Sequence, residues 1–467
     1  MEEKQSEDIL YETVISNGYC VGCGVCSAPK NSPFKIIMDK YGQYISEPVE
    51  KLTVENPKTN YNSLCPFGNE SKDEDEIAKD YFSEDCNHNK MLGYYNSIYA
   101  GHVSEGDFRK NGSSGGMGSW LLHELLNKNV VDYIVHVKSK HSSSDVNNIP
   151  FHYQVSNSPG DIRRGGKSRY YPAELSEALH TIRNQPGRYA IIGLPCFIKG
   201  VRLLQSQDPI YAERIQYCIG LVCGHLKSAH YAESLAWQMG VNPSDLKAID
   251  FRVKDSSQPA NCYSTYAKGS SKEKTIPTKQ LLGADWGGGA LKYKACDFCD
   301  DVFAETADIA IGDAWLPEYV HDSNGTNLVL TRNLYIKKLI TDALSDRRLI
   351  LDEISSDRAA MSQDAGLRHR KGAIGYRLHI EKTKSSWVPK KRISPSTKIR
   401  PKHEINRQKI RSEIRDLSRD SFLMAKKRND LSFYTESMQP IFNELHHSNK
   451  KPLRNKIILK IKNFIYG

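Results

Sequence analysis

The strongest constraint on this chain is a run of three closely spaced cysteines near its start, followed later by a Cys-Pro pair. The ligand candidates are Cys20, Cys23, Cys26 and Cys65. Small residues between the first three let the backbone curl, so that three thiolates can converge on one iron–sulfur cluster. The spacing therefore predicts one [4Fe-4S] cluster. The alternatives are a zinc site, which favours C-x2-C pairs over triplets, and an unrelated cysteine cluster.

Four further cysteines are candidates for a second metal site, although they are scattered along the chain. They are Cys196, Cys223, Cys296 and Cys299. The first two follow apolar, strand-like runs, and the last two form a C-x2-C turn. Scattered ligands carry little information in their spacing, so two other interpretations stay open. In these, Cys196 and Cys223 are small buried apolar side chains, and the C-x2-C turn binds zinc.

Two glycine-containing segments are candidates for binding the phosphates of a nucleotide-type cofactor. Residues 112–116 lie between a predicted strand and a predicted helix, where backbone amides and the helix dipole favour an anion. Residues 163–170 combine glycine with basic side chains, although a solvated surface turn would have the same composition. Neither segment matches the P-loop or G-x-G-x-x-G pattern. The cofactor-binding candidates are Gly112, Ser113, Ser114, Gly115, Gly116, Gly166, Lys167, Ser168 and Arg169.

His225, two positions after Cys223, is the candidate catalytic residue. An imidazole titrates near neutral pH, so this side chain could donate a proton to a bound flavin or substrate. A purely structural histidine is the alternative.

The pattern of apolar runs predicts three parts. Residues 1–75 are expected to form a ferredoxin-type [4Fe-4S] domain that contains a strand pair at 34–38 and 43–45. Residues 90–385 are expected to form a larger domain that contains the two glycine-containing segments and the four scattered cysteines, and residues 386–467 a basic, mostly helical tail with no compact core. Predicted strands alternate with predicted helices in the middle part, so the fold class is α+β or α/β.

The charge distribution argues against nucleic acid as a partner. The net charge is +10, but residues 381–467 contain 22 Lys and Arg against 8 Asp and Glu, so the rest of the chain is mildly acidic. We find no secretion signal and no apolar run long enough to span a membrane, which predicts a cytoplasmic protein. In that compartment, 11 cysteines favour metal binding or redox chemistry over disulfides.

The basic, partly apolar segment 450–466 suggests peripheral membrane contact through an amphipathic helix. A helix packed on the body of the protein, or a disordered segment, is the alternative.

In their order along the chain, these motifs resemble the beta subunit of the coenzyme F420-reducing hydrogenases and dehydrogenases. The matching segments are the cysteine triplet and residues 112–116, 166–170, 193–196, 223–225, 296–299 and 308–315. The resemblance implies that residues 90–385 form the flavin and iron–sulfur domain, with FAD bound there and its phosphates near the two glycine-containing segments. It also implies a second [4Fe-4S] cluster near the flavin, held by the four scattered cysteines.

The chain departs from the family pattern at three places, and these departures argue against the deazaflavin substrate more than against the cofactors. The chain has Gly-Leu-Pro-Cys where the family has Gly-Thr-Pro-Cys, and Cys-Gly-His where it has Cys-His-Gly. Its ferredoxin part also keeps the cysteines of one cluster instead of two.

The function that the resemblance implies is an oxidoreductase. Electrons would pass from a reduced carrier, such as ferredoxin or a partner hydrogenase or dehydrogenase subunit, through the clusters to FAD and an organic acceptor. Some family members are associated with surface-polysaccharide synthesis, which is a further prediction for this chain. The alternative is a non-catalytic electron-carrier or assembly subunit whose basic tail docks an acidic partner.

Overall fold

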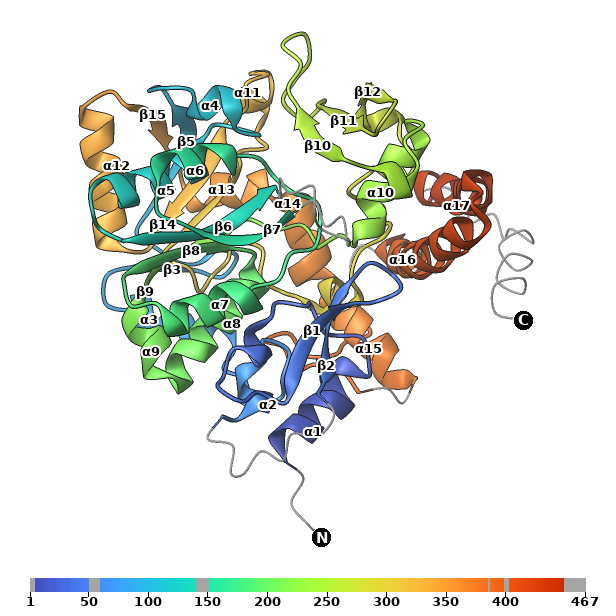
Figure 1. The fold of residues 1–467 in the computed structure, drawn as a ribbon, viewed down its shortest axis with the longest axis horizontal. Helices are drawn as coiled ribbons and strands as arrows, with labels where there is room; N and C mark the ends of the chain where they lie inside the picture. Colours follow the sequence, from blue (N-terminus) through green and yellow to red (C-terminus); the bar gives the residue numbers. More distant parts are fainter. Residues whose placement is uncertain (1–4, 50–58, 140–150, 385–386, 399–402, 449–467) are drawn as a thin grey trace.

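A computed structural model describes residues 5–49, 59–139, 151–384, 387–398 and 403–448 (Figure 1). Its centre is a sheet of eight strands in the order β15-β5-β14-β13-β9-β8-β6-β7. These strands are β5 (Ser97–Val103), β6 (Tyr133–Ser139), β7 (Phe151–Ser156), β8 (Tyr189–Gly193), β9 (Ile215–Leu221), β13 (Ile309–Asp313), β14 (Asn327–Thr331) and β15 (Leu349–Glu353).

The four central strands of this sheet are parallel, and the outer strands are antiparallel to their neighbours. β13 pairs with β9, β9 with β8, and β8 with β6 in parallel register. The carboxyl ends of these four strands therefore lie along one edge of the sheet, which is where open α/β sheets bind ligands.

The two faces of the sheet bury different helices. Ala190 and Ile191 are neighbours on β8 and point to opposite faces, so they belong to different hydrophobic cores. The core of Ala190 contains apolar side chains of α5 (Met117–Asn127) and α12 (Leu334–Ser345). The core of Ile191 contains those of α7 (Ser176–Asn184) and α8 (Pro195–Gln207).

The N-terminal unit packs into this second core. It contains α1 (Ser6–Leu10), the antiparallel pair β1 (Phe34–Met38) and β2 (Tyr44–Pro48), α2 (Tyr61–Leu64) and α3 (Glu74–Phe82). Val25 and Leu64 of this unit share a core with Ile198 of α8. The backbone N–H of Leu175 also donates to the Cys23 carbonyl at 3.0 Å. The cysteine-rich unit and the large sheet are therefore held together by a continuous core.

A third region lies beside the sheet and ends in a helical hairpin, drawn red in Figure 1. It comprises α10 (Ala229–Gln238), the antiparallel strands β10 (Ala248–Val253), β11 (Ser264–Lys268) and β12 (Glu273–Pro277), and the hairpin α16 (His403–Arg428) and α17 (Leu431–His446). Leu235, Ile414 and Phe442 share one core.

The remaining α-helices and strands are short or connect these parts. They are β3 (Asn87–Asn89), β4 (Gly93–Tyr95), α4 (Phe108–Asn111), α6 (Pro159–Arg164), α9 (Pro209–Arg214), α11 (Pro317–Val320), α13 (Ser356–Ser362), α14 (Asp364–Leu367) and α15 (Ile374–Thr383). Among the described residues, no helix is both long enough and apolar enough to span a membrane.

The mixed α/β class agrees with the sequence-based expectation, as does the strand pair of the N-terminal unit. The tail differs from expectation in one respect, because α16 and α17 bury apolar side chains against α10 instead of lacking a core. The predicted amphipathic segment 450–466 lies outside the described residues.

Candidate functional site

The first four candidate cysteines line one small cavity in the N-terminal unit. Cys20, Cys23, Cys26 and Cys65 surround it together with apolar side chains, including Leu10, Val14 and Ile36. Gly22 is needed between the first two cysteines, because its φ is +61° and an added Cβ would lie 2.2 Å from the Tyr44 carbonyl oxygen.

Backbone amides point at one of these sulfurs. The N–H groups of Gly22 and Ser46 donate to Cys20 Sγ at 3.4 and 3.3 Å. Such donors stabilise negative charge on sulfur. Burial raises the pKa of Cys65 to about 12, so an unligated thiol would stay protonated in this apolar setting. Deprotonation here requires compensating positive charge, which a metal cluster supplies.

The four scattered cysteines also meet around one cavity. Cys196, Cys223, Cys296 and Cys299 line it together with Val21, Phe67, Leu194, Pro195, Leu226 and Arg370. Cys196 lies in the first turn of α8 directly after β8, and Cys223 follows β9. Because β8 and β9 are adjacent parallel strands, their carboxyl ends bring these two cysteines to the same edge of the sheet. The Leu226 N–H donates to Cys296 Sγ at 3.2 Å.

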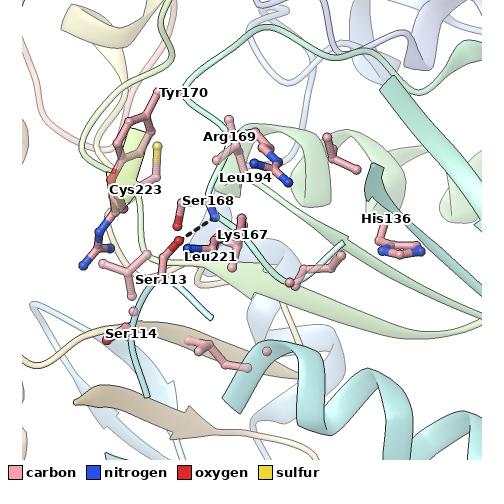
Figure 2. A pocket seen from close by; sticks show the side chains of 18 of the residues that line it. Ser113, Ser114, His136, Lys167, Ser168, Arg169, Tyr170, Leu194, Leu221 and Cys223 are labelled. Atoms are coloured by element: carbon pink, nitrogen blue, oxygen red, sulfur yellow. Dashed lines mark hydrogen bonds between the residues drawn. The ribbon is translucent and has the colours of Figure 1, made fainter. Parts of the chain in front are cut away.

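Both glycine-containing segments line a larger cavity of about 290 Å³ at the same edge of the sheet. The two segments are in direct contact, since the Ser168 N–H donates to Ser113 Oγ at 2.9 Å (Figure 2). The predicted residues that line this cavity are Gly112, Ser113, Ser114, Gly116, Gly166, Lys167, Ser168 and Arg169. Gly115 does not line it and packs behind the loop, where an added Cβ would lie 2.7 Å from the Gly101 carbonyl oxygen.

His225 lines the same cavity and stacks on Trp286, with ring centroids 4.3 Å apart. Its Nε2 is buried and has no hydrogen-bond partner within the described part of the chain. Burial, followed by the charge of Lys227, lowers the pKa of His225 well below its usual range. The imidazole is therefore neutral, and it can offer a hydrogen bond but does not store a proton at neutral pH.

The cavity also has a cationic lining. The Arg169 guanidinium lies over the Phe151 ring at 4.7 Å, and its buried Nε has no hydrogen-bond partner among the described residues. Arg252 instead forms a paired contact with the Asp313 carboxylate at 2.8 and 3.1 Å. Lys167 pairs with Asp250 at 3.1 Å. An anionic cofactor with an aromatic ring system suits a cavity with this lining.

The three cavities adjoin one another. Val21 lines both cysteine cavities. Leu194, Cys223 and Leu226 line both the second cysteine cavity and the larger cavity. The three cavities therefore form one continuous series from the N-terminal unit to the edge of the large sheet.

No group of three or more His, Cys, Asp or Glu side chains in the described ranges is arranged to hold a single metal ion. A cubane cluster makes a different demand, because its four thiolates surround an inorganic body and do not converge on one point. The two sets of four cysteines, each around an apolar cavity, have the donor chemistry that such a cluster requires.

Trp286, Arg252 and Arg370 are among the cavity residues that were not identified from the sequence. Trp286 lies in a glycine-rich loop and had a weak signal there as an isolated aromatic residue. Arg252 and Arg370 lie in segments with many other charges, and no sequence motif marked either of them as a site residue.

Comparison with known proteins places most of these residues within two family models. A model of the coenzyme F420 hydrogenase/dehydrogenase beta subunit N-terminus matches residues 98–180, and one of its C terminus matches residues 187–357. No curated protein matches the chain. A chain of the F420-reducing [NiFe] hydrogenase complex from Methanosarcina barkeri is similar in structure, at 14% sequence identity and a TM-score of 0.48. That match covers 63% of this chain and 96% of the other.

Proposed function

Since the chain belongs to the coenzyme F420 hydrogenase/dehydrogenase beta-subunit family, we propose that it is an iron–sulfur flavoprotein oxidoreductase. It would take single electrons from a reduced carrier protein and deliver them in pairs to an organic acceptor. The observation that carries this proposal is the series of three adjoining cavities, two of them lined by four cysteines each.

The first cavity would hold a [4Fe-4S] cluster on Cys20, Cys23, Cys26 and Cys65, and the second would hold one on Cys196, Cys223, Cys296 and Cys299. The larger cavity would hold FAD, with its phosphates at the two glycine-containing segments. When bound, the clusters supply one-electron transfer and the flavin supplies two-electron chemistry.

The protein's own residues supply three things to this chemistry. Val21 and Leu194 each line two neighbouring cavities and place apolar side chains between them. Trp286 covers His225 on one side. His225 would donate a hydrogen bond from its neutral ring to a bound group, which is the form that its lowered pKa supports.

The acceptor stays open in this proposal. The departures at Leu194 and His225 from the family motifs argue against assigning the deazaflavin coenzyme. The link to surface-polysaccharide synthesis remains a prediction from resemblance. Peripheral membrane contact also remains a prediction, because residues 450–466 lie outside the described residues.

The first prediction concerns metal and flavin content. Full-length protein purified without oxygen is expected to contain about eight iron atoms and about one flavin per chain, as two cubane clusters and one FAD require. Replacement of either Cys65→Ser or Cys299→Ser is expected to remove about half of the iron. Iron and acid-labile sulfide assays, with the visible absorption spectrum, measure this.

The matched control is Cys262→Ser, which removes a cysteine that lines neither cysteine cavity. It is expected to leave iron and flavin unchanged. A colourless, zinc-containing protein after anaerobic reconstitution would reject the proposal. Flavin that is reduced by ferredoxin without turnover of any small molecule would favour the carrier-subunit alternative.

A further inference from the structure

A buried arginine contacts the second cysteine cavity from outside the segments that define the family. Arg370 lies on the π-helical turn Arg368–Gly372, beyond residue 357, where the second family model ends. Its side chain lines the second cysteine cavity, and the residue is only 1% exposed.

The guanidinium is fixed on three sides. Nε donates to the Gly224 carbonyl at 3.0 Å, and Nη1 donates to the Asp301 carbonyl at 3.3 Å. Nη2 also donates to the Gly224 carbonyl and approaches Cys223 Sγ at 3.7 Å. Two carbonyls thus hold the positive charge beside a proposed cluster ligand.

The charge of Arg370 is not neutralised by an ion pair. Within the described residues its acceptors are carbonyl oxygens and a sulfur, and no carboxylate lies within ion-pair distance. The nearby Arg392 behaves differently, because it pairs with Glu305 at 2.6 Å and Asp300 at 3.0 Å. Arg370 therefore places a positive charge without a carboxylate partner against Cys223, at the second cavity.

Among the described residues, no charged side chain lines the first cysteine cavity. Its lining is made of cysteines, apolar residues, a glycine and Ser46. Lys199 influences Cys65, but its ammonium is paired with the buried Glu74 carboxylate at 3.3 Å. Arg370 is the charged group with the largest effect on the pKa of Cys223, Cys296 and Cys299, although Asp300 and Asp301 act on Cys299 in the opposite direction. The two proposed clusters thus differ in the presence of this unpaired, buried cation.

We propose that Arg370 raises the reduction potential of the second cluster above that of the first, which drives electrons inward toward the larger cavity. This inference rests on the proposed function. Reduction adds one electron and one negative charge to a cluster, and no bond forms or breaks. A fixed positive charge stabilises the reduced form, and it does so strongly where water is excluded. The electron comes from the reduced carrier protein, which is oxidised.

The experiment is a redox titration of full-length protein, reconstituted without oxygen and followed by electron paramagnetic resonance. Three arginine variants are compared with the unchanged protein. Arg370→Gln removes the charge and Arg370→Lys keeps it. Arg332→Gln is the control, because Arg332 is also 1% exposed and donates to carbonyls but to no sulfur.

In Arg370→Gln, the higher of the two midpoint potentials is expected to fall by about 59 mV or more, which is a tenfold change in a one-electron equilibrium. The other potential is expected to stay the same. Arg370→Lys is expected to restore most of the difference, and Arg332→Gln to leave both potentials unchanged.

Two unchanged potentials in an Arg370→Gln protein that holds both clusters would overturn the inference. If the Arg370→Gln protein contains only one cluster, the Arg370→Lys protein provides the test. Two clusters with the original potentials in the lysine variant support a role for the charge, and loss of the cluster in both variants overturns it. A single cluster in the unchanged protein would instead refute the proposed function, before any variant is made.

Discussion

Asp297 illustrates how individual buried charges shape this molecule. It lies between Cys296 and Cys299 and is 1% exposed. Lys292 donates to its carboxylate at 2.5 Å and Arg415 at 2.6 Å. Burial alone would raise the pKa of Asp297, but Lys292, His369 and Arg415 together hold it well below its usual range. The C-x2-C turn is thus anchored by an ionised side chain that is itself fully paired.

We expect His136 to make the stability of the folded protein depend on pH. It is 3% exposed, lines the larger cavity and bonds through Nε2 to Ser156 Oγ at 2.9 Å. Burial, and then the nearby Lys138, lowers its pKa from 6.5 to about 4, while Asp161 opposes this shift. Between pH 6.5 and about pH 4, the unfolded chain binds one more proton at this residue than the folded chain does. Stability should therefore fall by about 1.4 kcal/mol per pH unit as the pH drops below 6.5.

The check is anaerobic urea unfolding of the original protein and of His136→Gln at pH 7.5, 6.0 and 5.0. The glutamine variant cannot take up this proton, so it should lose less stability over the acid range. Equal losses in both proteins would show that other groups cause the acid sensitivity.

Among the secondary-structure elements, the hairpin of α16 and α17 contacts both the core of the third region and the wall of the larger cavity. Its apolar side chains complete the core beneath α10 and the three-stranded sheet. Its polar side chains extend further, since Ser418 Oγ accepts from the Leu291 N–H at 2.8 Å and Arg411 Nε donates to the Gly287 carbonyl at 2.6 Å. These contacts hold the loop that carries Trp286. The hairpin thus supports the wall of the larger cavity.

Replacement of Ile414→Ala tests this role. Ile414 is fully buried, so its truncation should lower the free energy of unfolding by about 2–5 kcal/mol. Flavin retention should also fall, because the Trp286 loop loses its support. Urea unfolding and flavin content after gel filtration measure the two effects. Lys409→Ala, at an exposed position of the same helix, should change neither.

At the scale of the whole protein, the N-terminal unit and the large sheet form one body. Gly200 of α8 approaches the cysteine loop so closely that an added Cβ would lie 2.9 Å from a Val25 methyl carbon. The Tyr44 N–H donates to the Tyr293 hydroxyl at 2.7 Å, which ties the N-terminal unit to the turn before Cys296. The proposed first cluster would therefore be part of the same body as the proposed flavin site and would not be carried on a separate domain.

This arrangement predicts the path of electrons. In Cys65→Ser, reduction of the proposed flavin by a reduced ferredoxin should slow at least tenfold, because the proposed entry site for electrons is lost. Reduction by dithionite, a small molecule, should proceed at close to the original rate. Stopped-flow absorbance of the flavin measures both rates. Similar slowing with both reductants would mean that the substitution damages the flavin site itself.

Short-range features of the molecule were predictable from the sequence. Cys20, Cys23 and Cys26 lie within one loop, so covalent connectivity alone keeps their sulfurs near one another. The strand pair β1 and β2 and the helix α5 were likewise expected, because their apolar residues recur at the period of a strand or a helix. Gly115 was assigned to the cofactor by its neighbours in sequence, yet it faces the sheet.

Long-range contacts could not be read in this way. Cys196 and Cys223 meet because β8 and β9 pair in parallel, and a pairing between distant strands leaves no fixed spacing in the chain. Arg370 reaches Cys223 across 147 positions, with no motif around it. Local chemistry therefore follows from the order of residues along the backbone. Which distant thiolates share a cavity, and which charge lies beside them, depends on how the sheet and its helices pack.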